Sequence, residues 1–556
     1  MSNSDHPGNP SPPTRAVLPG RTGILLAASL GVVFTTVFAI KAGKDLGWDQ
    51  LNYHYYSVYA WLAGRVTYHI APAGHQNYYN PLVYLPYYWL INHVRPAMAG
   101  GIFGSLVGLN FVFIYLLARI VSPMNGSKWA WPFAFLCGAV GFSDPFFLEF
   151  IGTTDVDNLV SLPVLASLCA LCWACLPGIE TKQQNRAYAF AGFLLGAATG
   201  LKLTFAVFAA GMGLALLLLW PVLRLNLSRY LRFAAGGLLG FLFTGGYWSW
   251  FLWNYYRNPF FPHWNDYFRS PWALPTDYRD LRFAPPSATA GLKYPFQWLM
   301  GVHSSSEDAF RDARYAFLTV FVVLIAAALI GKWIVRRWRH CGETTETRCF
   351  VARQHRWLLL AFTVISYVLW IQMFAIQRYL IPLGLISGLL FWLALDWLIP
   401  AHRVKIAVFV FLSVFCILWV RIDVSGWRFP YGSNWYGVEL APEVQAPGTL
   451  FIMTGGGPMG YIVPFLPDTT RTVRLIGTMI PDSETEMVRQ AREIISRHTG
   501  PIRSLSAIPL EKSDYALLSR FGLALDEACV QFRTHVDRFT SCRVTRGDPP
   551  GSQAKP

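Results

Sequence analysis

The chain contains a series of apolar runs, each about as long as a membrane is thick, and this pattern constrains its fold more than any other feature. A helix needs about 20 mostly apolar residues to cross the hydrocarbon layer, where its backbone groups must all be hydrogen-bonded internally. Such runs predict transmembrane helices near residues 22–41, 98–120, 129–143, 159–177, 187–201, 204–222, 233–254, 316–334, 357–375, 379–399 and 404–422. We therefore predict an α-helical polytopic membrane protein with about eleven transmembrane helices.

The composition favours a membrane protein over one that binds nucleic acid. Hydrophobic residues make up 54% of the chain and charged residues only 14%, which is far from the balance of a soluble domain. The formal net charge is +15, but the Lys and Arg residues stand between the apolar runs and are not gathered on one soluble domain. The expected partners are therefore membrane lipids and not nucleic acid.

Basic residues mark every alternate loop, and basic loops stay on the cytoplasmic side of a membrane. The clearest basic loop follows the run at 316–334 and contains Arg336, Arg337 and Arg339. With the N-terminus in the cytoplasm, the segments on the outer side are 42–97, 144–158, 255–315 and the chain after about 423. Most of the acidic residues lie in these segments. We expect a multi-pass protein of a bacterial inner membrane, with its chemistry on the outer side.

The composition divides the chain into three parts. Residues 1–21 are rich in Pro and Ser and are expected to form a disordered cytoplasmic N-terminus, and residues 22–422 form the membrane domain. Residues 423–556 are more polar and predict a small α/β domain on the non-cytoplasmic (periplasmic) side, with a helix over 483–498 capped by Asp482 or Ser483. Cys529 and Cys542 bracket a hairpin-sized stretch on the oxidising side, so we predict a disulfide between them.

Asp49 lies just beyond the first apolar run, among Trp48, Tyr53 and His54. A carboxylate in such a partly desolvated place is suited to act as a base, with a pKa raised by burial. The alternative is that Asp49 caps an amphipathic helix that lies along the membrane interface and ends near Arg65. The two roles are compatible.

An acidic residue directly after the first span, followed by an aromatic helix ending in Gly64-Arg65, resembles the GT-C superfamily of integral membrane glycosyltransferases. That superfamily includes the protein mannosyltransferases and the lipid A aminoarabinose transferases. Similar features continue over about residues 22–422 and do not include the tail. They are Gly152-Thr-Thr-Asp-Val-Asp-Asn158, Gly200-Leu-Lys-Leu-Thr204 and Gln377-Arg-Tyr-Leu380.

The resemblance implies an inverting hexosyl- or pentosyltransferase that uses a sugar carried on a polyprenyl phosphate. The acceptor would be a lipid or surface glycan at the outer face, and Asp49 would be the general base. Asp155 and Asp157 compete for the role of the second catalytic acid. The family's usual Asp-Glu pair is absent from the first outer loop, so no metal ligand is assigned and no cofactor is certain, although a divalent cation is possible.

A departing lipid phosphate gains negative charge and needs fixed cations nearby. Lys202 and Arg378 each lie at the outer end of an apolar run and are the candidates, although either could instead snorkel to lipid headgroups. Trp48 and Tyr53 could stack on a sugar or belong to an aromatic belt. His54, together with His263 and Arg269 of the third outer loop, completes the expected substrate-binding set.

Two other functions are weighed against the enzyme. A transporter or flippase of a lipid-linked glycan would predict charges near the middle of spans and inverted repeats, whereas the charged residues here gather at the ends of runs. A non-catalytic membrane scaffold would leave the polar outer segments unexplained.

Overall fold

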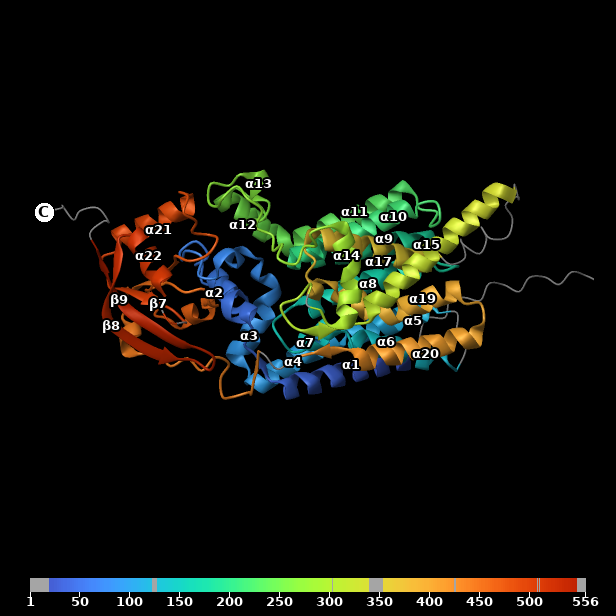
Figure 1. Cartoon of the computed structure of the whole chain (residues 1–556), viewed down its shortest axis with the longest axis horizontal. Coiled ribbons are helices and arrows are strands. Elements are labelled where there is room, and N and C mark those ends of the chain that lie inside the picture. The colour runs from blue at the N-terminus through green and yellow to red at the C-terminus, as the bar shows by residue number, and fades with distance from the viewer. Residues whose placement is uncertain are drawn as a thin grey trace, which may run out of the picture.

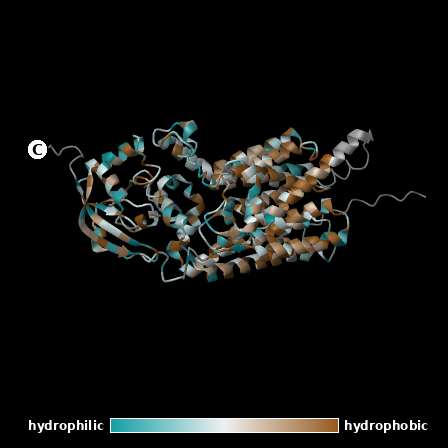
Figure 2. Ribbon diagram, viewed as in Figure 1, coloured by the Kyte–Doolittle hydropathy of each residue, from teal (hydrophilic) through white to brown (hydrophobic). Residues whose placement is uncertain are grey.

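The computed structural model describes residues 20–122, 128–302, 304–339, 354–424, 427–507, 509 and 511–547. Most of the predicted N-terminal segment 1–21 and of the basic loop after the run at 316–334 therefore lies outside the described residues. A bundle of long helices occupies one end of the molecule and a small α/β domain the other, with α2 (Tyr55–Leu62) and α3 (Leu85–His93) between them (Figure 1). Hydrophobic residues dominate the bundle, whereas the α/β end is mixed (Figure 2).

Every apolar run expected to span the membrane is helical. The helices of the bundle are α1 (Arg21–Ala42), α4 (Pro96–Gly108), α5 (Asn110–Val121), α6 (Ala130–Phe142), α8 (Asp157–Ala174), α9 (Thr181–Leu201), α10 (Ala206–Leu218), α11 (Leu227–Phe241), α12 (Tyr247–Tyr256), α15 (Arg314–Arg339), α17 (Gln354–Met373), α18 (Ile381–Leu385), α19 (Ser387–Leu398) and α20 (His402–Trp419). Short helices in the outer segments are α7 (Pro145–Glu149), α13 (Asn265–Phe268) and α14 (Ala288–Met300).

The number of helices long and apolar enough to cross a membrane is smaller than predicted. Among the described residues 6 helices meet this criterion, or 7 if the pair Gln377–Leu385 and Ser387–Leu398, bent by 59°, counts as one span. The number of qualifying helices falls below the predicted number of about eleven because several of the predicted spans are partly polar or short. α9 begins with the polar sequence Thr-Lys-Gln-Gln-Asn-Arg, α11 carries Arg229 and Arg232 in its first turns, and α6 and α10 are short.

Glycines set the closest helix contacts in the bundle. A Cβ built at Gly196 of α9 would lie 1.9 Å from the carbonyl oxygen of Gly237, and one at Gly240 of α11 would lie 2.0 Å from that of Phe193. Such small residues let two backbones approach and pack by van der Waals contact inside a membrane. The α9–α11 pair therefore holds the outer end of α9, where Lys202 follows, in a fixed place.

The C-terminal part forms the predicted α/β domain. Its 5-stranded sheet has the order β6-β5-β7-β9-β8, and β5 pairs in parallel with β6 and β7, whereas β9 is antiparallel to β7 and β8. The elements are β5 (Leu450–Met453), β6 (Arg471–Arg474), α21 (Glu486–Arg497), β7 (Ile502–Leu505), α22 (Lys512–Arg520), β8 (Leu523–Arg533) and β9 (Arg538–Arg546).

Two details of this domain bear on the sequence predictions. The predicted helix over 483–498 begins at Glu486, and the predicted caps are wrong, because Thr485 has the extended backbone and accepts a hydrogen bond from the Val488 amide. Cys529 and Cys542 face each other across β8 and β9 and form a disulfide.

The outer segments are tied to the first residues of the tail. β1 (Lys44–Asp45) pairs with β4 (Arg428–Phe429), and β2 (Phe310–Arg311) pairs with β3 (Arg421–Ile422). Strands β3 and β4 therefore belong structurally with the outer loops as much as with the α/β domain that follows. α2, expected along the membrane interface, is instead mostly buried and packs against α3 and the 3-10 segment Gly460–Phe465 of the tail.

Candidate active site

The first and second outer loops are joined by Asp45. One carboxylate oxygen of Asp45 accepts a hydrogen bond from the Gly47 amide at 2.8 Å, and the other accepts from the amide and hydroxyl of Thr154 at 3.0 Å each. Thr154 also contacts the ring of His54 at 2.8 Å. These bonds bring Asp49, which begins the π-helical turn Gln50–His54, beside Asp155.

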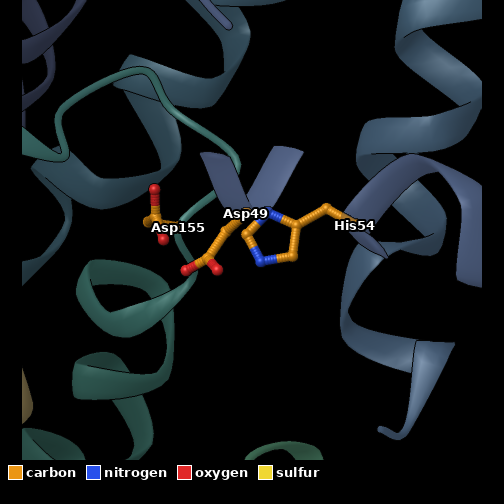
Figure 3. A group of neighbouring side chains, drawn as sticks. All are labelled: Asp49, His54 and Asp155. Atoms are coloured by element: carbon orange, nitrogen blue, oxygen red, sulfur yellow. The ribbon is translucent and has the colours of Figure 1, made fainter. Parts of the chain in front are cut away.

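Asp49 lies at the centre of a small charged group. Arg378 donates to the Asp49 carboxylate at 3.0 Å and lies 3.6 Å from that of Asp155. Both carboxylates are nearly buried, with 12% and 11% of the side chain exposed. Asp49 and His54 come from the same turn and Asp155 from the second outer loop (Figure 3), and their potential ligand atoms all lie within 4.8 Å of one another.

The two carboxyl groups differ in protonation. Burial, the largest single contribution, would raise the pKa of Asp49, but the charge and hydrogen bond of Arg378, together with smaller contributions from His54 and Lys202, outweigh it and hold that pKa below the usual value, contrary to the predicted rise. Burial and then the charge of Asp49 raise the pKa of Asp155 well above its usual value. The opposite shifts favour an ionised Asp49, able to accept a proton, beside an Asp155 that holds its proton more tightly, an arrangement that divides the roles of two close carboxyls.

His54 does not carry charge at this site. Burial lowers its pKa to about 3, and its ring stacks on Tyr84 at 4.2 Å between centroids. The neutral ring supports the turn that follows Asp49 and lies outside the two cavities described below.

The second predicted cation, Lys202, is paired differently. Its ammonium group donates to both carboxylate oxygens of Asp157, at 2.8 and 2.7 Å, and Asp157 is fully buried. The ring of Tyr379 contacts both cations, with its centroid 5.1 Å from the Lys202 nitrogen and 5.5 Å from the Arg378 guanidinium carbon. Of the two acids that competed for the second catalytic role, Asp155 thus lies beside Asp49, whereas Asp157 is engaged with Lys202.

Two cavities meet at this group. The first, about 1200 Å³ including its open mouth, is lined mainly by aromatic and aliphatic side chains of the first outer loop, the segment 200–207, α12, the loop at 259–264 and the segment 373–379, and includes Lys202. The second, about 2400 Å³ with its open mouth, is lined by Asp49, Asp155, Arg378 and other charged residues of the outer loops and tail. Tyr53, Tyr79 and Tyr379 line both. We call them the apolar cavity and the polar cavity.

The other residues predicted from the sequence to bind substrate differ in whether they line a cavity. Trp48 lines the polar cavity with 40% of its surface exposed, Tyr53 lines both cavities, and His263 lines the apolar one. Arg269 lines neither. It is exposed at the end of α13, where the backbone is left-handed at φ +55°.

Several residues of the polar cavity were not predicted. Arg428 of β4 donates to the carbonyl oxygens of Glu149 and Ile151 and joins the tail to the second outer loop. Burial and then Asp308 raise the pKa of Glu149 to about 9, so this carboxyl group is protonated at neutral pH. The contacts of Arg428 cross hundreds of residues, so no local sequence signal points to them. Glu149 is an acid in the second predicted outer segment, a signal of the same kind as the one that identified Asp155.

Asp49, His54 and Asp155 are the one group among the described residues with the donor types and spacing of a divalent-cation site. The donors fit such an ion, but Arg378 donates to the same Asp49 carboxylate. A cation there would have to share or displace that contact.

The chain is matched by no protein-family model and by no curated protein. Among solved structures it is similar to the crystal structure of ArnT from Cupriavidus metallidurans bound to undecaprenyl phosphate, with a TM-score of 0.50 and 12% sequence identity. The similarity covers 97% of this chain and 100% of that one, so it extends beyond residues 22–422 into the tail. The chain therefore has the GT-C fold that its outer-loop sequence resembles.

Proposed function

We propose that this protein is a membrane glycosyltransferase that moves a sugar from a polyprenyl-phosphate donor to a hydroxyl group of a lipid or glycan acceptor at the outer face of a bacterial inner membrane. One observation carries the proposal. The Asp49 carboxylate, held ionised by Arg378, lies where an apolar cavity containing Lys202 meets a polar cavity.

The two cavities match the two halves of such a donor. A polyprenyl chain needs an apolar groove, and its phosphate needs cations where the groove ends. The apolar cavity has aromatic and aliphatic walls that include Lys202 and Tyr379, and the Tyr379 ring also contacts Arg378. The similarity in fold to a protein whose solved structure contains undecaprenyl phosphate supports the same class of ligand.

The reaction follows from the charges at the site. Asp49 accepts the proton of the acceptor hydroxyl as that oxygen forms a bond to the anomeric carbon of the sugar. The bond between the anomeric carbon and the phosphate oxygen breaks, and the lipid phosphate leaves with the electron pair, towards Arg378 and Lys202. A single displacement of this kind inverts the anomeric centre. A divalent cation at Asp49, His54 and Asp155 is the alternative source of positive charge, and adding a chelator to the transfer assay separates the two.

The test is Asp49→Asn in the purified full-length protein. The variant should lose sugar transfer by at least about 100-fold, the contribution expected of a general base, while still binding undecaprenyl phosphate. Asp468→Asn is the control, because Asp468 is an exposed carboxylate of the tail. Full transfer by Asp49→Asn would contradict the proposal. Translocation of a lipid-linked glycan across vesicles without any transfer would favour the flippase alternative.

A further inference from the structure

The C-terminal domain is bonded directly to the segment that carries Asp49. Its edge strand β6 is extended by the first outer loop, because Ile70 donates to the Thr472 carbonyl at 2.9 Å and accepts from the Arg474 amide at 3.0 Å. An exposed edge strand offers unpaired backbone groups to a partner strand. Here the partner is the chain's own loop, so the sheet and the first outer loop form one unit.

The side chain of Arg474 continues this contact towards the catalytic turn. One guanidinium nitrogen donates to the Asn52 side-chain oxygen at 3.3 Å and to the Pro72 carbonyl at 2.8 Å, and the other donates to the Gly457 carbonyl at 2.8 Å. Asn52 lies inside the π-helical turn Gln50–His54, three residues after Asp49. Its amide group in turn donates to the Ala73 carbonyl and the Gln76 side chain.

The burial of Arg474 is costly. Only 6% of the residue is exposed, and burial lowers its pKa to about 10 without any opposing acidic partner among the described residues. A guanidinium group without a carboxylate pays a desolvation penalty that hydrogen bonds to neutral acceptors only partly offset. A neutral side chain would fill the same space at lower cost, so the three donated bonds are the feature that distinguishes arginine here.

The backbone of the tail also packs directly against the backbone of this turn, at a glycine that leaves no room for a side chain. A Cβ built at Gly460 would lie 2.0 Å from the Asn52 carbonyl oxygen. The hydroxyl oxygen of Tyr436 accepts a hydrogen bond from the side-chain amide of Gln50 at 2.5 Å. The turn is thus held from the tail at its first residue and at its centre.

We propose that Arg474 is a positioning residue: the C-terminal domain uses its buried guanidinium to fix the turn Gln50–His54, and through it the Asp49 carboxylate, in the orientation that faces Arg378. The same bonds fix the segment at 72–76, of which His75 and Gln76 line the polar cavity. The C-terminal domain is therefore part of the catalytic machinery. This inference rests on the proposed function.

The experiment compares three variants of the full-length protein with the wild type. Arg474→Met removes the donated bonds, Arg474→Lys retains the charge, and Gly460→Ala displaces the Asn52 carbonyl without changing any charge. Arg503→Met is the control, because the Arg503 side chain donates to Ser541 within the same sheet. The readouts are amide hydrogen exchange of residues 49–56, the rate constant of transfer, and the affinity for undecaprenyl phosphate.

We expect Arg474→Met and Gly460→Ala to speed exchange in residues 49–56 by at least about tenfold, with β5 and β7 still protected. The rate constant should fall by at least about tenfold while donor affinity stays within about twofold, and Arg474→Lys should restore part of it. Wild-type exchange in both variants would overturn the proposal. So would loss of protection throughout the tail, which would make Arg474 a stabiliser of its own domain. A wild type without transfer would instead defeat the proposed function, and the exchange measurements would still decide the role of Arg474.

Discussion

The apolar and polar cavities share Tyr53, Tyr79 and Tyr379 but differ in most of their lining. Helices, the loop at 259–264 and aromatic residues of the first outer loop wall the apolar cavity, and its cation, Lys202, is neutralised by a fully buried partner, Asp157. The polar cavity is walled by outer loops and tail, and its cation, Arg378, lies between the two carboxyl groups of Asp49 and Asp155. One cation is thus fixed by a single dedicated partner and the other is shared.

This difference points to different roles for the two cations, with Lys202 binding the lipid phosphate and Arg378 taking part in the reaction. A lysine bonded to both oxygens of a buried carboxylate has one stable arrangement, suited to a site where a lipid phosphate rests. An arginine shared by an ionised and a protonated carboxyl can redistribute its hydrogen bonds as charge moves from acceptor to leaving group. The comparison makes distinct predictions for the two cations and for the two cavities.

The largest effect is expected at Arg378. Arg378→Met removes the cation beside both the leaving phosphate and Asp49, and should lower the rate constant of transfer by about 100- to 1000-fold. It also removes the charge that holds down the pKa of Asp49. Because Asp49 acts when ionised, activity is lost as the pH falls through its pKa. The acid limb of the pH profile should therefore move to higher pH in the residual activity of Arg378→Met and stay low in Arg378→Lys, and an unmoved limb would contradict the assignment.

Substitution of Lys202 should lower both the folding stability of the protein and its affinity for the donor. Lys202→Met leaves Asp157 buried without a partner, which costs about 3–5 kcal/mol of folding free energy. The double variant Lys202→Met/Asp157→Asn should recover most of the thermal stability but not the affinity for undecaprenyl phosphate. If the double variant binds the lipid phosphate as the wild type does, Lys202 serves only to pair with Asp157.

The smallest effects are expected from substitutions that narrow one cavity each, and they test whether the two cavities bind different substrates. Ser249→Trp narrows the apolar cavity and Thr478→Trp narrows the polar one. We expect the first to weaken donor affinity by about tenfold and the second to raise the KM for the acceptor by a similar factor, which is about 1.4 kcal/mol in each case. Steady-state kinetics with the donor and acceptor concentrations both varied would measure the two changes separately. Equal effects of both variants on both substrates would mean that the cavities are not separate binding regions.

The sequence predicts the parts of this site that follow from a local pattern. Asp49, Asp155, Lys202 and Arg378 each lie at the outer end of an apolar run, where a charged residue is costly unless it has a purpose, and the structure brings them together. The helical segments and the α/β character of the tail are predicted for the same reason, since run length and composition are local, whereas the strand order of its sheet is not.

The parts that were missed depend on contacts between distant segments. Asp45 accepts hydrogen bonds from Thr154, 109 residues away, and Arg428 donates to Glu149 at a separation of 279 residues. No spacing rule connects such pairs. The lowered pKa of Asp49 was missed for the same reason: burial was foreseen, but the opposing charge comes from Arg378, 329 residues further along the chain.

The central claim is that a polyprenyl phosphate occupies the apolar cavity with its phosphate next to Asp49. The direct measurement is an experimental structure of the full-length protein with undecaprenyl phosphate. The account predicts lipid density along the walls formed by α10, α11 and α12, with the phosphate in contact with Lys202 or Arg378. Density for the lipid phosphate elsewhere on the protein, with the apolar cavity still free of lipid, would contradict it.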